Sequence, residues 1–119
     1  MTRAAAVASA RANVWRPQAL ADYLDRLTRI HFTAEWLRPL RAGILPTAGP
    51  EDSARRLAAA GHPLLMLHGR HDMTFPAALI EDAAKLIPSA RAVVIEEAGH
   101  MAHIDQPQEW LNAVAQFLC

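Results

Sequence analysis

Cysteine is nearly absent from this chain of 119 residues. Its single cysteine, Cys119, cannot form an internal disulfide, so we expect a reducing, cytoplasmic setting. Net charge is absent as well, because 12 Lys and Arg residues balance 12 Asp and Glu residues. The chain therefore has neither the basic surplus typical of nucleic-acid binding nor an acidic tail, and we expect no nucleic-acid partner.

Long apolar runs are also missing. No stretch of about 18 apolar residues occurs, so we expect no membrane-spanning segment and no membrane partner. The first residues are rich in small side chains, but Arg11 and Asn13 interrupt their apolar character. We therefore expect residues 1–13 to form a flexible or helical lead and not a targeting segment.

The overall composition is that of a folded domain. Hydrophobic residues make up 52% of the chain and charged residues 20%, which is typical of globular proteins and not of disordered ones. The length is sufficient for one ordinary domain with a modest core.

Residues 14–60 have the pattern of helices. Pro17 is a favoured residue in a first helical turn, and apolar residues then recur at helical spacing: Leu20, Tyr23, Leu24, Leu27 and Ile30. A second helix is expected from Thr33, a candidate N-cap, with Pro39 shortening or kinking it. A third is expected to end at Gly61.

In the remaining residues the spacing of apolar side chains changes. An apolar run at 63–69 and a Val- and Ile-rich run at 91–99 predict two short buried strands. Amphipathic segments at 76–87 and 106–118 predict helices. This strand–helix–strand–helix order predicts two parallel strands joined by a right-handed crossover.

Two chemically active side chains follow the predicted strands. Asp72 lies in the loop after the first strand and His100 in the loop after the second. Adjacent parallel strands bring such loops to the same sheet edge, although these residues are 28 positions apart. A carboxylate beside a histidine can orient the imidazole and stabilise its charged form while the other ring nitrogen accepts a proton.

These residues carry a family resemblance. The segments "PLLMLHGRHDMTFP" and "ARAVVIEEAGHMAHIDQPQEW" resemble the C-terminal part of the α/β-hydrolase fold, with its strand, Gly-x-x-Asp, helix, strand, Gly-His and final helix. The resemblance covers residues 62–118. It implies that Asp72 is the catalytic acid and His100 the base, that Gly69 shapes the turn before the acid, and that Gly99 permits close backbone approach.

The resemblance sets the expected fold and its parts. We expect an α/β chain in which 61–119 is the C-terminal α/β-hydrolase segment. Residues 14–60 are similar to the end of the helical cap that many such enzymes insert, although this likeness is looser. The lead at 1–13 completes the expected division.

The nucleophile of the family is missing from these residues. The serines, Ser9, Ser53 and Ser89, do not lie in a Gly-x-Ser-x-Gly elbow, and the oxyanion loop is absent as well. A base without a nucleophile is of little use, so we expect no efficient hydrolysis by the chain alone. The residues leave open whether the nucleophile is serine or aspartate.

A second consequence concerns partners. The strand at 63–69 should expose an unpaired edge and an apolar face. We therefore expect the chain to dock on a complementary N-terminal hydrolase half, or to pair with a second copy of itself as a homo-oligomer. The function that follows is hydrolysis of a small, ester-like substrate by the completed enzyme. The alternative is a non-catalytic, truncated or self-associating fragment.

Further candidates lie near the pair. Four residues are expected to contact substrate between cap and sheet, with ordinary core packing as the alternative: Met73, Phe75, Met101 and Trp36. His68 is expected to be a strand-end residue and His103 a supporting one. A metal site built from His68, His71, Asp72, His100 and His103 is a rival interpretation. The hydrolase resemblance explains Asp72 and His100 better, so we expect no metal and no cofactor.

Overall fold

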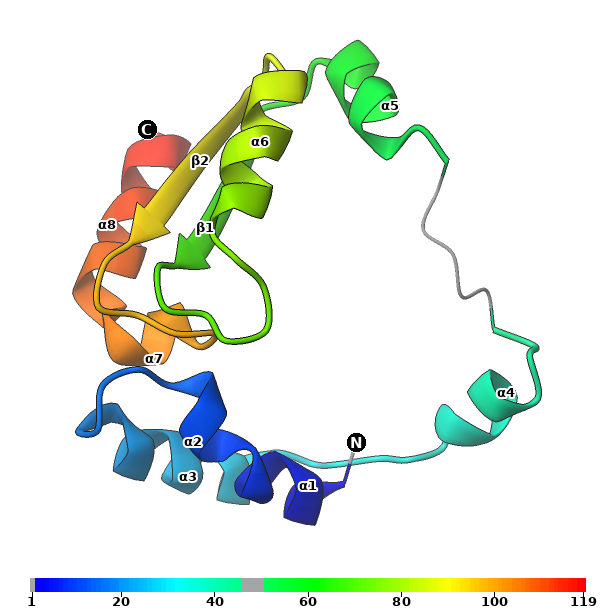
Figure 1. The fold of residues 1–119 in the computed structure, drawn as a ribbon, viewed down its shortest axis with the longest axis vertical. Helices are drawn as coiled ribbons and strands as arrows, with labels where there is room; N and C mark the ends of the chain where they lie inside the picture. Colours follow the sequence, from blue (N-terminus) through cyan, green and yellow to red (C-terminus); the bar gives the residue numbers. More distant parts are fainter. Residues whose placement is uncertain (1, 46–50) are drawn as a thin grey trace.

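The computed structural model describes residues 2–45 and 51–119 of the chain (Figure 1). These residues form eight helices and two strands. The helices are α1 (Arg3–Ala8), α2 (Ala10–Asn13), α3 (Ala19–Arg29), α4 (Leu37–Arg41), α5 (Ser53–Ala60), α6 (Ala78–Leu86), α7 (Ala102–Asp105) and α8 (Pro107–Leu118). The strands are β1 (Leu64–Gly69) and β2 (Ala90–Ile95).

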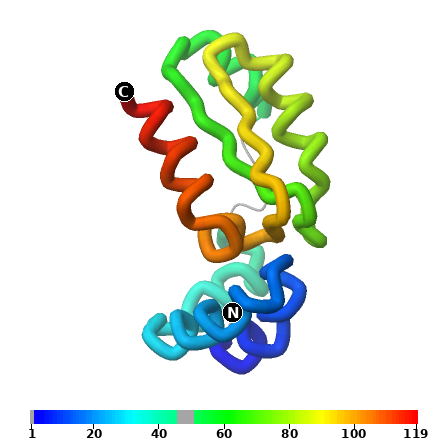
Figure 2. The backbone as a smooth tube through the Cα atoms, turned by 90° about the vertical axis from the view of Figure 1, so that its left-hand side faces the viewer, coloured from blue at the N-terminus to red at the C-terminus, as the bar shows by residue number. Residues whose placement is uncertain are grey.

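The two strands form a parallel sheet. Their register runs from Leu64 opposite Ala90 to Gly69 opposite Ile95. The crossover between them is α6, and α8 follows β2, so the predicted strand–helix–strand–helix order is confirmed. Figure 2 shows the two strands lying between α8 and α6. Because both strands end at the same edge, the loops that carry Asp72 and His100 also leave the sheet there.

The N-terminal helices form a separate small core. Side chains from α1, α2 and its C-cap, and α3 pack together with one side chain of α7: Ala6, Ala10, Val14, Tyr23, Leu27 and Ile104 are all buried. Within the lead, residues 3–8 and 10–13 form helices, and small alanine side chains allow α1 and α2 to lie close against α3. Helix α7 was not predicted from the sequence.

The helices of residues 14–60 are shorter than expected. Helix α4 begins at Leu37 and not at Thr33, whose hydroxyl instead accepts the N–H of Glu35. The position of Pro39 explains the late start, since proline is tolerated in a first turn but would clash in the interior of a longer helix. As expected, Gly61 ends α5 in the left-handed conformation, with a φ of 66°.

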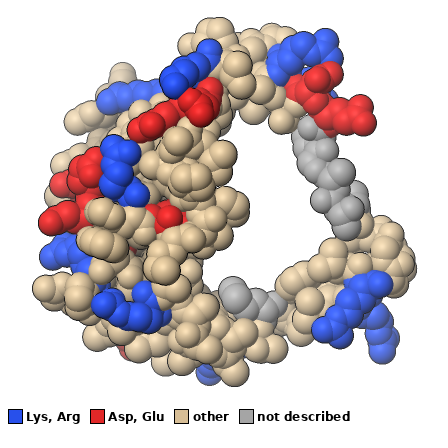
Figure 3. All heavy atoms as spheres, viewed as in Figure 1, with Lys and Arg blue, Asp and Glu red and all other residues tan. Residues whose placement is uncertain are grey.

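The fold is open. Its radius of gyration is 16.6 Å, whereas a compact domain of this length has about 13.5 Å. Helix α4 lies apart from the sheet and from the N-terminal helices, whereas α5 contacts α6, and the surface that faces α4 is largely uncharged (Figures 1 and 3). Exposed large apolar side chains include Trp36, Leu40, Leu57, Met73 and Phe75. Among the described residues, β1 has a hydrogen-bonded neighbour on one edge only.

No helix within the described part of the chain is long and apolar enough to cross a membrane.

Candidate active site

The acid loop and the histidine loop meet at the carboxyl edge of the sheet. The acid loop follows Gly69 and the histidine loop follows Ile95, which face each other in the register. Backbone hydrogen bonds join the loops, from Arg70 N–H to Ile95 O at 2.9 Å and from His71 N–H to Ala98 O at 2.8 Å. The relative position of the loops is therefore set by the backbone as well as by side chains.

Asp72 and His100 are in direct contact. His100 Nδ1 lies 2.8 Å from Asp72 Oδ2. The Asp72 side chain is only 3% exposed, whereas that of His100 is 36% exposed. Because an ionised carboxylate can only accept, the proton lies on Nδ1 of the neutral ring and Nε2 is left as an acceptor. A buried carboxylate that accepts from Nδ1, on a partly exposed ring whose Nε2 can accept a proton, is the geometry of a general base with its orienting group.

The other oxygen of Asp72 is held by its own loop. Oδ1 accepts the N–H of Thr74 at 2.7 Å and of Phe75 at 3.2 Å, which makes a local turn stabilised by the carboxylate. Burial acts to raise the pKa of Asp72. The hydrogen bonds from His100, Thr74 and Phe75 outweigh it, so the pKa lies below its ordinary value. Asp72 is therefore ionised at neutral pH.

This lowered pKa predicts a contribution of Asp72 to stability that depends on pH. The unfolded carboxyl titrates near pH 3.9, above the folded one, so acid protonates the unfolded state first. The contribution is complete above about pH 5 and is lost as the pH falls through the folded pKa. We expect Asp72→Asn to have a smaller loss of unfolding free energy between pH 5 and pH 3 than the wild type, as measured by urea denaturation.

The control for this experiment is Glu109→Gln, which removes an exposed carboxylate on α8. It should leave the acid dependence close to that of the wild type. An Asp72→Asn variant with the full wild-type acid dependence would contradict the assignment.

His68 supports the acid loop from β1. Its Nε2 lies 2.9 Å from the carbonyl oxygen of Phe75 and 3.5 Å from Asp72 Oδ2, and its side chain is only 12% exposed. Since a carbonyl can only accept, Nε2 carries the proton and donates it to Phe75. His68 is thus at the strand end, as expected, and it also closes the loop around Asp72.

Two glycines allow the loops to approach. A Cβ on Gly69 would lie 2.1 Å from the carbonyl oxygen of Gly99 and 2.5 Å from that of Ala98. A Cβ on Gly99 would lie 3.0 Å from the backbone nitrogen of Trp15. Gly99 permits close backbone approach, as the family resemblance implied. Gly69 does the same, which is a different role from shaping a turn.

Asp105 is the residue that the sequence did not single out. Its side chain is buried, and its oxygens accept the backbone N–H groups of Gly99, Trp15 and Arg16 at 2.8 to 2.9 Å. An aspartate that follows an apolar residue near a helix start looks like an ordinary surface cap. Only the packing of the N-terminal segment against this loop reveals its role.

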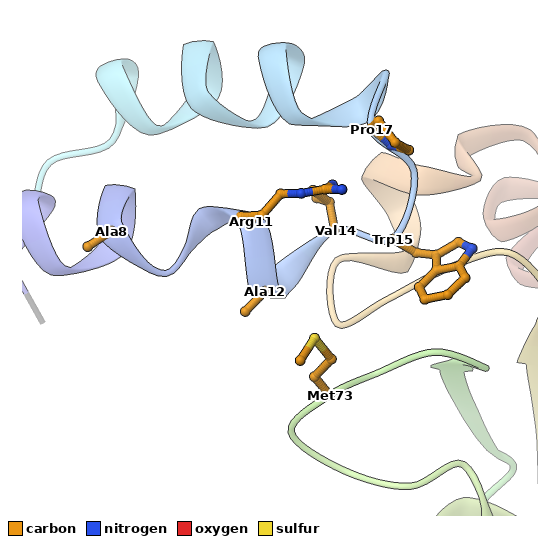
Figure 4. A pocket seen from close by; sticks show the side chains of 7 residues that line it. All are labelled: Ala8, Arg11, Ala12, Val14, Trp15, Pro17 and Met73. Atoms are coloured by element: carbon orange, nitrogen blue, oxygen red, sulfur yellow. The ribbon is translucent and has the colours of Figure 1, made fainter.

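The predicted substrate-contacting residues lie at different places. A cavity of about 180 Å³ beside the pair is lined by Leu67, His68, Gly69, Asp72, Phe75, His100, Ala102, His103 and Trp110. A larger cavity of about 660 Å³ lies between α2 and the acid loop, where Met73 points toward Ala12 (Figure 4). Phe75 thus borders the cavity beside the pair, and Met73 borders the cavity between α2 and the acid loop. Met101 packs against the N-terminal core, and Trp36 precedes α4; neither lines these two cavities.

The five candidate metal ligands do not form one cluster. The ring of His71 stacks on Trp15 with centroids 3.8 Å apart, and the ring of His103 faces Trp110 edge-on at 6.0 Å. Burial lowers the pKa of His103, and Arg26 lowers it further against the opposing effect of Asp105. Within residues 2–45 and 51–119, no three His, Cys, Asp or Glu side chains converge as ligands of one metal ion would.

Comparison with known proteins gives a family and several relatives. Residues 5–107 match the family described as alpha/beta hydrolase fold. A pimeloyl-acyl-carrier-protein methyl ester esterase of Aeromonas hydrophila subsp. hydrophila is 33% identical over 85 residues, which are 71% of this chain and 33% of the relative. The enzyme of the same name from Xanthomonas campestris pv. campestris is 33% identical over 106 residues, covering 75% of this chain and 42% of the relative.

A solved structure is also similar. A serine hydrolase from the polyaromatic-hydrocarbon-degrading bacterium Cycloclasticus zankles superimposes with a TM-score of 0.65 at 17% identity. The match covers 98% of this chain and 44% of that one, and at this identity it shows the fold. The chain thus spans less than half the length of each of these relatives.

Proposed function

Because the chain belongs to the alpha/beta hydrolase fold family, we propose that it supplies the catalytic acid, Asp72, and the catalytic base, His100, of an ester hydrolase. The observation that carries the proposal is the 2.8 Å contact between His100 Nδ1 and the buried Asp72 Oδ2, with the His100 side chain 36% exposed and lining a cavity. The esterase relatives support the ester-like substrate class.

The proposed reaction has two stages. A nucleophile attacks the ester carbonyl, and His100 Nε2 accepts its proton and then protonates the leaving alcohol. A water molecule, activated by the same nitrogen, then releases the acid. Asp72 keeps the proton of the neutral ring on Nδ1 and stabilises the imidazolium that forms at each stage. If the nucleophile is an aspartate, His100 acts only in the second stage.

The nucleophile in this proposal comes from outside these 119 residues. None of the serines here lies in an elbow. An N-terminal hydrolase half can supply the elbow and the oxyanion donors. The same half would pair with the open edge of β1 and cover apolar side chains that are now exposed. A second copy of this chain could cover the edge but brings no elbow.

The substrate in this proposal is a small carboxylic ester. Phe75 lines the cavity beside the pair, and Met73 lines the larger apolar cavity beyond the acid loop. Both side chains are large and more than half exposed, so they are available for contact with an acyl or alkyl group. The proposed setting is the cytoplasm, which rests on the single cysteine.

Complementation tests the proposal. The chain is assayed on short-chain aryl esters by itself, mixed with an elbow-bearing N-terminal hydrolase half, and fused behind that half. We expect hydrolysis only when the half is present, because the base then has a nucleophile to deprotonate. Sedimentation velocity on the same samples should show that the two chains form a complex.

Two controls accompany this assay. The N-terminal half alone must be inactive, and a half whose elbow serine is replaced by alanine should bind the chain without restoring activity. A complex or fusion that forms and folds but hydrolyses no ester would overturn the catalytic proposal and favour the non-catalytic alternative. A well-folded 13 kDa monomer that ignores the half would overturn the proposed partner.

A further inference from the structure

Asp105 lies where the N-terminal helical segment meets the histidine loop. Its side chain is the largest fully buried one in the described residues, at 1% exposure. Oδ2 accepts the N–H groups of Trp15 at 2.9 Å and Gly99 at 2.8 Å, and Oδ1 accepts that of Arg16 at 2.9 Å. One carboxylate therefore joins two segments that are about 90 residues apart in the sequence.

The residues on both sides of His100 belong to this junction. Gly99, which precedes His100, donates to Asp105, and Met101, which follows it, donates its N–H to Asn13 O at 2.8 Å. The backbone of Trp15 lies so close to Gly99 that a Cβ there would be 3.0 Å from its nitrogen. The backbone of His100 is thus held before the histidine by Asp105, which itself binds Trp15 and Arg16, and after it directly by Asn13.

We propose that Asp105 is a positioning residue for His100, which couples the base to the N-terminal helical segment. This inference rests on the proposed function, because positioning matters only if His100 is the base. Side-chain chemistry explains why an aspartate is needed. Two oxygens that only accept can satisfy three N–H donors, whereas an asparagine must turn an NH2 group toward at least one of them.

Asp105→Asn tests the inference, and the readout is the imidazole of His100. In the folded chain, the Nδ1–H proton between His100 and Asp72 should give a far-downfield proton NMR signal. We expect Asp105→Asn to shift or broaden this signal and to speed the amide exchange of Gly99 and Met101 at least tenfold. In the completed hydrolase, kcat should fall about 10- to 100-fold with a nearly unchanged KM, because the base is misplaced.

A matched variant distinguishes positioning of His100 by Asp105 from a merely structural role of Asp105. Leu27→Ala removes a buried side chain from the same N-terminal core but touches none of these hydrogen bonds. It should lower the melting temperature while the His100 signal and the kcat stay close to wild type. Asp105→Glu keeps both acceptor oxygens, so it should fold even if the asparagine variant does not, and it should recover part of the His100 signal.

The outcomes are distinct. An unchanged His100 signal and unchanged Gly99 exchange in folded Asp105→Asn would overturn the inference, and so would equal changes in Leu27→Ala. If the completed enzyme with Asp105 intact has no activity, the proposed function fails. The NMR and exchange measurements still decide whether Asp105 positions His100.

Discussion

Replacing His100 with alanine should lower the kcat of the completed hydrolase by about 10⁶-fold, with little change in KM. The variant retains the orienting carboxylate of Asp72 but has no group to accept the proton of the nucleophile. Asp72→Asn should lower kcat by less, about 10⁴-fold, since an amide can hold the ring in the wrong tautomer and cannot stabilise its charge. Removing both should cost little more than removing His100 alone, because the two side chains act as a unit.

The measurement is steady-state hydrolysis of an aryl ester by the fused or complemented enzyme, with thermal unfolding to show that each variant folds. His62→Ala is the matched control, because His62 is an exposed histidine ahead of β1 and away from the pair. It should retain wild-type activity. A His100→Ala enzyme that keeps more than a tenth of the wild-type kcat would exclude His100 as the base.

Gly69→Ala should be among the most destabilising single changes in the chain. The new methyl group would lie 2.1 Å from the carbonyl oxygen of Gly99 and 2.5 Å from that of Ala98. Both neighbours are backbone atoms of the histidine loop, so no side chain can rotate away and the loop itself must move. We expect a loss of about 3 kcal/mol in unfolding free energy, at the upper end of the usual cost of overpacking.

The same displacement should impair catalysis. Because Gly99 immediately precedes His100, a shift of its carbonyl moves the base away from Asp72. A misplacement of about 1 Å can lower the rate about 100-fold, so the completed Gly69→Ala enzyme should lose activity even at temperatures where it is folded. Urea denaturation and aryl-ester assays on one preparation measure both effects.

Gly61→Ala is the matched control for this change. Position 61 also favours glycine, but for a different reason, which is its left-handed φ of 66°. A Cβ at this position would meet no atom within 4 Å. Its replacement should cost only about 1 kcal/mol and leave activity unchanged, because the strain is confined to the end of α5. Equal losses of stability in the two variants would show that the contact between the loops is less tight than the structure indicates.

Much of the sheet region was predictable from local patterns. The apolar runs predicted β1 and β2, and the amphipathic segments predicted α6 and α8, with Pro107 in the first turn of α8. The parallel arrangement followed from the intervening helix alone. Predicting that Asp72 and His100 lie close together required one further assumption, namely that the two strands are neighbours. The pairing of β1 with β2 in the structure agrees with that assumption.

Other features had no local signature. Helix α7 has only four residues, too few for an amphipathic period, so nothing in the sequence distinguishes it from a loop. The N-terminal helices are rich in alanine, whose small side chains give a weak periodic signal, although Ala6 and Ala10 are buried against α3. In the sequence Phe75 and Met101 are equally good candidates for lining a pocket, yet only Phe75 lines the cavity beside the pair.

The sequence by itself determined the kinds of elements, the edge at which Asp72 and His100 would meet, and the lack of an elbow serine among these residues, because periodicity, loop position and residue identity are all local properties. Only the tertiary structure decided what holds His100 in place. Asp105 bonds to Gly99, Trp15 and Arg16, and Gly69 lies against Gly99, through contacts between segments distant in the chain. Such contacts depend on backbone groups, which every residue carries, so no pattern of side chains in the sequence predicts them.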